Sequence, residues 1–484
     1  MQREDFIIEF IENEITDMPL YYNTQLIIHN EKFNQRLELN QLKINIDNFI
    51  DGKSLNRFFV LPGLRGIGKT TLLYQVYDYL LNNKNINPKN ILYMSFESLN
   101  DIIECNIRET VEIYLKNFHN TNLSLLNQNI FILVDECQYD NKWALSGKII
   151  YDKSKKIFMI FTGSSALHLE NANDADRRML KLPIAPLNYT QHLKLKHNLS
   201  FGEMSKSLEN LLFTGEIEKA AEQEIMTNGL LINSTDYVST DWEEYIKYGG
   251  FPILFEEYSH RNMCYKLVDI AKKVVNTDMI NIKNFTAENQ ANAMRILKFL
   301  ATQKPGEVSQ QKLSNYLRTS ASSVKNILDI LEKTQLIFHF EPYGESAKRI
   351  KKSWKYYFAT SSLRHALSLK IGTSMPYSEY EGVLLENLIA MLLFNLSNSE
   401  HLYFNIFIEA YKKKANKNVD FLIKRGFDEI IPIEVGRGKK NKLQIKKVMN
   451  RYNSNYGIVV SNATKSIEKD DDVIFIPLKT FSFL

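Results

Sequence analysis

The stretch that decides the fold of this 484-residue chain is Gly63-Leu64-Arg65-Gly66-Ile67-Gly68-Lys69-Thr70. It matches the phosphate-binding loop pattern G-x-x-x-x-G-K-[ST] at every fixed position. An apolar run at 58–61 precedes it, and a helical pattern at 71–77 follows it. Strand, glycine-rich loop and helix, in this order, are the context in which the pattern binds a nucleotide. The sequence therefore predicts a P-loop nucleotide site at 63–70.

Each position of this loop has a chemical task. Its glycines let backbone N–H groups and the following helix N-terminus point at the phosphates. We expect Lys69 to reach the β- and γ-phosphates and the Thr70 hydroxyl to bind Mg²⁺, which makes ATP and Mg²⁺ the predicted cofactors. The residues expected to contact the nucleotide here are Gly63, Gly66, Gly68, Lys69, Thr70 and Thr71.

A second apolar run, Ile130–Val134, ends in Asp135 and Glu136. A run without alternation is typical of a strand buried on both faces. Acids at its carboxyl end would face the crevice in which α/β sheets bind ligands. We expect Asp135 to hold Mg²⁺ through water and Glu136 to orient and polarise the attacking water. This pair favours ATP hydrolysis over passive binding.

The next apolar run, 157–161, leads into Thr162-Gly163-Ser164-Ser165. Thr162 or Ser164 can hydrogen-bond the γ-phosphate or the lytic water, or these residues can simply form a strand-to-loop turn. Arg177 and Arg178 follow in a loop. Either can act as an arginine finger, usually delivered by a neighbouring subunit, or stay a solvated surface charge.

Composition places the chain among ordinary globular proteins. The net charge of +4 is too small to indicate nucleic-acid binding by itself, so any basic surface must be local. Three widely separated cysteines predict a reducing compartment rather than a disulfide framework. The acidic start Met1–Asp5 is unlike a signal peptide, and the apolar run Leu388–Phe394 is too short to span a bilayer. We expect a cytoplasmic protein with no membrane partner.

The motifs and their order resemble the archaeal-type AAA/STAND-like P-loop ATPases that carry a winged helix and a C-terminal restriction-endonuclease-like domain. The resemblance runs from about residue 56 to the end and is poor over 191–245. It implies an α/β fold with a P-loop parallel sheet, a helical and winged-helix middle and a C-terminal α/β domain. The matching segments before the C-terminal domain are 63–71, 133–136, 161–165 and Tyr248-Gly249-Gly250-Phe251-Pro252.

Five regions follow from these patterns. Alternating strand and helix signals, with strands at 58–61, 91–96, 130–135 and 157–162, predict a parallel sheet in the ATPase core. The expected regions are an N-terminal extension (1–55), the P-loop ATPase core (56–190), a helical lid or linker (191–290), a winged helix with its connection (291–375) and a PD-(D/E)XK-like domain (376–484).

The winged-helix prediction rests on three helical patterns, 296–300, 309–317 and 322–331, followed by a strand at 336–340. In a DNA-reading module the third helix enters the groove. The module can equally serve packing or oligomerisation. The groove-facing candidates are Ser322, Ser323, Lys325 and Asn326, and the candidates for phosphate contact are Lys348, Arg349, Lys351, Lys352 and Lys355.

Glu386 on a helix, with Asp420 and Glu434 on two strands, resembles the PD-(D/E)XK nuclease arrangement. Such carboxylates would hold a divalent metal for phosphodiester hydrolysis. The lysine expected two residues after the second acid is replaced by Gly436. Because catalysis needs the whole constellation, a degenerate nuclease fold that binds is favoured over one that cuts. The candidates for replacing the lysine are Arg437, Lys439 and Lys440.

The sequence as a whole predicts an ATP-hydrolysing P-loop ATPase that couples turnover to conformational change in a nucleic-acid-associated assembly. Loops held by the γ-phosphate and released on hydrolysis would be the coupling device. The alternatives are an ATP-regulated, metal-dependent DNA nuclease and an ATP-switched scaffold. Expected partners are ATP, DNA and a second copy of the chain or another protein.

Overall fold

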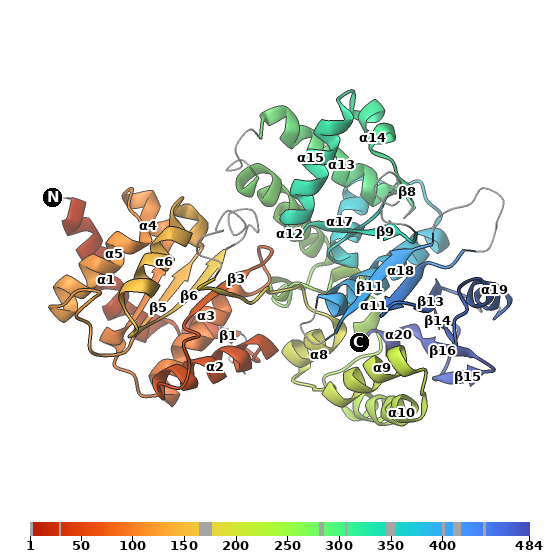
Figure 1. The fold of residues 1–484 in the computed structure, drawn as a ribbon, viewed down its shortest axis with the longest axis horizontal. Helices are drawn as coiled ribbons and strands as arrows, with labels where there is room; N and C mark the ends of the chain where they lie inside the picture. Colours follow the sequence, from red (N-terminus) through yellow and green to blue (C-terminus); the bar gives the residue numbers. More distant parts are fainter. Residues whose placement is uncertain are drawn as a thin grey trace. The chain divides into compact units, whose positions relative to one another are not determined.

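The structure is a computed structural model, and its chain divides into two compact units, residues 1–185 and 186–484 (Figure 1). Each unit is described by itself. The described residues are 3–28, 31–163, 177–279, 285–304, 307–344, 354–398, 402–409, 418–438 and 442–484.

The first unit contains a five-stranded parallel sheet in the order β4-β5-β6-β3-β7. The four predicted strands are confirmed to within one residue at either end. All residues of β3, β5 and β6 are buried, which explains their unalternating apolar runs. The strands are β3 (Phe58–Pro62), β4 (Ile91–Ser95), β5 (Ile130–Asp135), β6 (Ile157–Gly163) and β7 (Leu180–Lys181).

Helices cover both faces of this sheet (Figure 1). On one face, Ile132 and Val134 share a core with side chains of α1, α5 and α6. On the other face, the Phe49 ring of α2 contacts the rings of Phe131 and Phe158. The helices are α1 (Arg3–Tyr21), α2 (Leu37–Ile50), α3 (Lys69–Asp78), α4 (Phe96–Ile102), α5 (Ile107–His119) and α6 (Trp143–Lys153), and β1 (Ile27–Ile28) pairs with β2 (Glu31–Lys32).

The second unit begins with helices and continues with helices and strands. Hydroxyl or amide side chains cap several helix N-termini, among them Asn188, Ser309 and Thr360. The helices are α8 (Tyr189–His197), α9 (Gly202–Thr214), α10 (Glu218–Asn233), α11 (Asp241–Tyr248), α12 (His260–Lys273), α13 (Ala287–Thr302), α14 (Gln310–Leu317), α15 (Ala321–Lys333), α17 (Ser361–Ile371), α18 (Tyr377–Ser397), α19 (Lys442–Tyr452) and α20 (Leu478–Phe481).

A mixed nine-stranded sheet runs through the second unit in the order β15-β16-β14-β13-β12-β11-β9-β10-β8. The strand expected at 336–340 forms as β9, but it lies inside this sheet, because Phe407 of β11 pairs in parallel with Glu341. The strands are β8 (Glu307–Val308), β9 (Ile337–Pro342), β10 (Trp354–Phe358), β11 (Phe404–Ile408), β12 (Phe421–Arg425), β13 (Glu429–Gly436), β14 (Gly457–Ser461), β15 (Glu468–Asp470) and β16 (Val473–Pro477).

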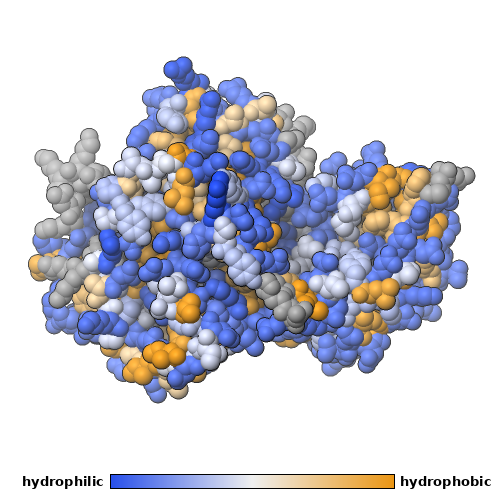
Figure 2. Space-filling model, turned by 180° about the vertical axis from the view of Figure 1, so that it is seen from behind, coloured by the Kyte–Doolittle hydropathy of each residue, from blue (hydrophilic) through white to orange (hydrophobic). Residues whose placement is uncertain are grey.

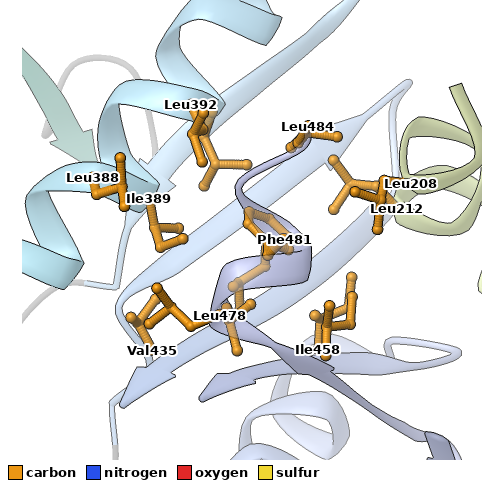
Figure 3. Packing of buried hydrophobic residues seen from close by; sticks show 14 of the residues in the cluster. Leu208, Leu212, Leu388, Ile389, Leu392, Val435, Ile458, Leu478, Phe481 and Leu484 are labelled. Atoms are coloured by element: carbon orange, nitrogen blue, oxygen red, sulfur yellow. The ribbon is translucent and has the colours of Figure 1, made fainter. Parts of the chain in front are cut away.

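The core of the second unit joins α18 to the sheet and to the end of the chain. Figure 3 shows Leu388 and Leu392 of α18 facing the strand residue Ile458 and the C-terminal side chains Phe481 and Leu484. All five are buried. Because α18 is surrounded by other elements, it is apolar on several sides rather than along one stripe.

The surface is mainly hydrophilic, with small separate hydrophobic groups (Figure 2). Four exposed apolar side chains lie on α10, namely Ile225, Met226, Leu230 and Ile232. Within the described ranges, the helices are all too short or too polar to cross a membrane.

Asn387 is expected to be a structural residue that fastens β10 to α18. Its fully buried side chain accepts the Phe358 N–H and donates to the Phe358 carbonyl oxygen, both at 2.9 Å. Asn387→Ala leaves two buried backbone groups unpaired, so the free energy of unfolding should fall by about 3 kcal/mol in urea titration. The half-buried Asn395 of the same helix supplies the control, and a loss no larger than that of Asn395→Ala would contradict this role.

Candidate functional site

The phosphate loop joins the end of β3 to the start of α3, and its glycines are needed by the backbone. Gly66 and Gly68 have φ of 77° and 91°, in the left-handed region that favours glycine. At Gly63, a Cβ atom would lie 2.5 Å from the Ile184 carbonyl oxygen and 2.5 Å from Ile67 Cδ1. The loop therefore takes a compact path that larger residues at these positions would disturb.

Lys69 is the first residue of α3 and is buried. Its Nζ donates hydrogen bonds to the carbonyl oxygens of Gly63 and Leu64, both at 2.9 Å. The phosphate loop thus surrounds the Lys69 ammonium group at the N-terminus of α3. This is an anion-binding arrangement, because a positive side chain and the positive end of the helix dipole coincide.

Two hydroxyl groups hold the Asp135 carboxylate. Thr70 Oγ1 donates to Asp135 Oδ2 at 2.7 Å, and Thr162 Oγ1 donates to Asp135 Oδ1. Burial, and then the neighbouring Glu136, raise the pKa of Asp135, while the two hydroxyls and Lys69 oppose the shift. A carboxylate and a hydroxyl in contact are hard oxygen donors of the kind Mg²⁺ prefers, so these residues fit the predicted ion.

Glu136 sits in an unusual backbone conformation directly after β5. Its φ is 53°, which is uncommon for a non-glycine residue, and its N–H donates to Thr162 Oγ1 at 3.1 Å. Thr162 therefore bridges the two acids, and its predicted contact with phosphate or lytic water stays a prediction. Strained backbone of this kind often accompanies function.

Gln138 is a site residue that the sequence reasoning missed. Its Nε2 donates to Glu136 Oε2, and the residue is buried. Its Oε1 would lie 2.9 Å from a Cβ atom on Gly163, so a glycine at 163 makes room for it. The available signal was an amide side chain two residues after the acid, in the short 3₁₀ turn Cys137–Tyr139.

The other predicted site residues of the first unit are Thr71, Ser164, Arg177 and Arg178. Thr71 follows Thr70 in α3 and is half-buried. Arg178 Nε lies 2.6 Å from Asp152 Oδ1 of α6, while Arg177 is exposed. Ser164 lies outside the described residues.

Arg36, from the segment expected to be an extension, braces the phosphate loop. Its guanidinium is buried and donates to the carbonyl oxygens of Ile67 at 2.7 Å and Ala185 at 2.9 Å. Glu38 neutralises it at 2.9 Å. Arg36 therefore links the phosphate loop to the backbone at Ala185.

The second unit brings Glu386, Asp420 and Glu434 together with a lysine from β10. Lys355 Nζ lies 2.5 Å from Glu386 Oε1, and the Tyr357 hydroxyl donates to the same oxygen at 2.8 Å. Asp420 Oδ2 accepts the backbone N–H of Val435 at 2.8 Å. These contacts join β10, α18, β13 and the residue just before β12.

Burial, and then Glu386 and Glu434, raise the pKa of Asp420 to about 8. Burial works against the charge of Lys355, but Glu386 and Asp420 outweigh it and raise the pKa of the ammonium. Within the described ranges, which include all three acids, no three His, Cys, Asp or Glu side chains form a group that could hold a metal. As arranged, the cluster holds a lysine next to the carboxylates.

Lys355 corrects an expectation. The sequence places Lys355 among the candidates for phosphate contact. In the structure its side chain is only 13% exposed and pairs with Glu386. Arg437, a candidate replacement for the missing lysine, instead pairs with Glu381 at 2.7 Å. The other candidates in both groups, Lys348, Arg349, Lys351, Lys352, Lys439 and Lys440, lie outside the described residues.

On the predicted recognition helix, α15, the side chains of Ser322, Lys325 and Asn326 are exposed. Ser323 is half-buried and its Oγ donates to Asn289 Oδ1 at 3.4 Å. Three of the four groove-facing candidates are therefore accessible.

The chain is 30% identical to the uncharacterized protein MJ1637 of Methanocaldococcus jannaschii, over 98% of this chain and 94% of that one. It belongs to the MJ1637 family. In this chain, residues 55–193 match the model of an AAA domain. Residues 239–374 and 381–481 match two domains of unknown function, DUF8612 and DUF4143. Residues 55–193 thus have the fold of an AAA-type P-loop ATPase.

More distant relatives extend the comparison. The uncharacterized protein MJ1544 of the same archaeon is 25% identical over 80% of this chain and 76% of its own length. Among solved structures, the Walker-type ATPase PABY2304 of Pyrococcus abyssi covers 70% of this chain and 97% of its own, at 12% identity and a TM-score of 0.38. The Aeropyrum pernix ORC2 protein covers 72% and 98%, at 11% identity and a TM-score of 0.34.

Lys355→Met is expected to destabilise the second unit because it leaves buried carboxylates without their cation. The thermal midpoint should fall by roughly 5–10 °C near pH 8, on the basis of about 3 kcal/mol for breaking a buried pair. Without the cation, the carboxyl pKa values rise above their unfolded values. The deficit is therefore largest at high pH and shrinks as pH falls and the carboxyl groups become protonated.

The double variant Lys355→Met/Glu386→Gln is the matched control, since it removes the pair together. It should recover a large part of the lost stability. Equal midpoints for Lys355→Met and the wild type across pH 5.5–8.5 would show that Lys355 does not compensate this cluster.

Proposed function

We propose that this chain hydrolyses ATP and couples the turnover to conformational change in a nucleic-acid-associated assembly. The observation that carries the proposal is the hydrogen-bonded chain Thr70–Asp135–Thr162, with Glu136 beside it. It stands at the carboxyl ends of neighbouring parallel strands and at the N-terminus of the phosphate-loop helix. That edge of an α/β sheet is where ligands bind.

The proposed roles follow from chemistry and position. Loop N–H groups and Lys69 hold the β- and γ-phosphates, with Lys69 exchanging loop carbonyl oxygens for phosphate oxygens. Thr70 and Asp135 hold Mg²⁺, which when bound neutralises phosphate charge. Glu136 orients the attacking water and accepts its proton.

Gln138 would control when Glu136 acts. The Gln138 amide donates a hydrogen bond to Glu136 Oε2. A lytic water would have to donate to the same carboxylate, so the two would compete. A hydrogen bond to a charged group contributes about 1.5–3 kcal/mol, enough to hold one rotamer in the resting state. Nucleotide binding would have to release this contact before hydrolysis.

Arg177 is the better candidate for an arginine finger, because Arg178 is engaged by Asp152 within its own unit. A finger acting on another subunit requires a second copy of the chain. We therefore propose self-association in the ATP-bound state. The functional unit would be a homo-oligomer.

For nucleic acid, the element order α13-β8-α14-α15-β9-β10 supports a winged-helix assignment. Because β9 is an interior strand of the large sheet, DNA contact is proposed for the exposed face of α15. For the C-terminal sheet, the Lys355–Glu386 pair favours a binding or scaffolding role over phosphodiester cleavage. A metal-dependent nuclease ranks second.

Lys69→Ala should abolish ATP binding, whereas Glu136→Gln should bind ATP normally and lower kcat by about 10²–10⁴-fold, the usual contribution of a general base. Binding is measured by titration with a fluorescent ATP analogue, and turnover by phosphate release. Glu112→Gln, on the surface of α5, is the control. A Glu136→Gln protein that turns over at the original rate would refute the base assignment.

Gln138→Ala should raise basal kcat by roughly fivefold to tenfold and leave KM nearly unchanged, since it frees Glu136 from a charge-assisted hydrogen bond. Steady-state phosphate release measures both constants. Gln128→Ala, at an exposed amide in the same unit, serves as the control. A marked fall in kcat would instead mean that Gln138 positions Glu136 for catalysis.

A further inference from the structure

A hollow of about 360 Å³ opens in the second unit between α12 and α17, at the end of α11. These two helices pack side by side (Figure 1). The buried side chains of Val268 and Ala366 form part of its floor. Tyr248, which ends α11 and begins the Tyr-Gly-Gly-Phe-Pro segment, forms one wall. The ATPase mechanism uses none of these residues.

Aromatic rings stand at this hollow. The rings of Tyr248 and His260 are stacked, with centroids 4.5 Å apart and planes 11° from parallel. Tyr265 is 47% exposed and lines the same space. Rings arranged in this way offer flat surfaces to a planar ligand.

The charged groups of the hollow are cationic. Both cations lie over the Tyr265 ring, with the Arg261 guanidinium carbon 5.5 Å and the Lys370 Nζ 5.4 Å from its centroid. None of the described residues that line the space is a carboxylate. At the rim, Glu244 Oε1 lies 3.6 Å from His260 Nε2. The hollow therefore favours an anion next to a planar ring.

We propose that this hollow binds a single unpaired nucleotide. Its phosphate draws Arg261 and Lys370 away from the Tyr265 ring, and its base stacks on the ring face that they leave. Aromatic platforms beside cations are the general means by which proteins hold single-stranded nucleic acid without reading its sequence. The volume falls within the range of small-molecule sites. Paired bases of a duplex cannot present their faces in this way.

The partner class rests on the nucleic-acid association proposed above, but binding here requires no ATP turnover. The same chemistry occurs in a free mononucleotide and in a single strand. The experiment therefore needs an arm for each source, and it is carried out without ATP.

The first measurement is the fluorescence anisotropy of a labelled 15-nucleotide oligo-dT with the full chain. Tyr265→Ala should weaken binding roughly fivefold to 100-fold, the range for losing one stacked base. The double reversal Arg261→Glu/Lys370→Glu should weaken it at least as much and flatten the salt dependence. The matched controls, Phe427→Ala and Lys206→Glu, change an exposed aromatic residue and an exposed lysine elsewhere and should bind as the wild type does.

The second measurement uses Cys264, which lines the hollow and is half-buried, while Cys105 and Cys137 are buried. Iodoacetamide labelling at pH 8.5, read by mass spectrometry, reports on this one position. Oligo-dT should slow the alkylation of Cys264 and leave the other two unchanged. Protection by AMP as well identifies a free nucleotide as a source, and protection by oligo-dT alone identifies a strand.

Unchanged oligonucleotide affinity in both pocket variants, or no protection of Cys264 by either ligand, would overturn the proposal. ATPase activity of Tyr265→Ala is measured in parallel and should equal that of the wild type. The Tyr265→Ala measurements therefore test only the hollow, and Lys69→Ala tests only the ATPase assignment. Either proposal can then fail without the other.

Discussion

The buried carboxylate of Asp135 is the constraint on which the nucleotide site depends. Two hydroxyls, from α3 and from β6, donate to its two oxygens. Because a charged carboxylate is costly to bury, these donors and the Lys69 ammonium must lie close to it. The phosphate-loop helix, β5 and β6 are therefore held in one arrangement. Thr162 extends this control to the Glu136 backbone.

A similar constraint organises the second unit. Lys355, on a strand that precedes α18, offers the positive charge that Glu386 and its neighbouring acids require. Asn387, one residue further along the helix, holds the backbone of the same strand. Charge and hydrogen bonding together join β10 to α18, while the pairing of β9 with β11 makes β8–β10 part of the C-terminal sheet.

The sequence predicted the first unit well because its signals are local. The predictions of the loop at 63–70, of the strands at 58–61 and 130–135 and of the acids Asp135 and Glu136 all depend on short-range patterns. Gln138 was missed although it is close in sequence, because an amide has no fixed role after an acid. Its function depends on the side-chain contact with Glu136.

The second unit was harder to predict because its decisive contacts are long-range. The pairing of β9 with β11 joins residues more than sixty positions apart, and no periodicity marks it. Lys355 was assigned to DNA on the basis of neighbouring lysines in the sequence, whereas the fold places it against Glu386. The nucleotide hollow likewise combines α11 and α12, which end at Lys273, with α17, which begins only at Ser361. Such sites appear only when helices distant in sequence pack together.

The two acids Asp135 and Glu136, at the end of β5, differ in a way that suits a switch. Asp135 is held by two hydroxyls and has little freedom, whereas Glu136 combines a left-handed backbone with a single amide contact on its carboxylate. A left-handed non-glycine residue costs about 1–3 kcal/mol unless its surroundings maintain it. The Thr162 hydroxyl accepts the Glu136 N–H and donates to the Asp135 carboxylate. Displacement of Thr162 would therefore affect both acids at once. An event at the phosphates thus has a short path, through one hydroxyl, to the group proposed to activate water.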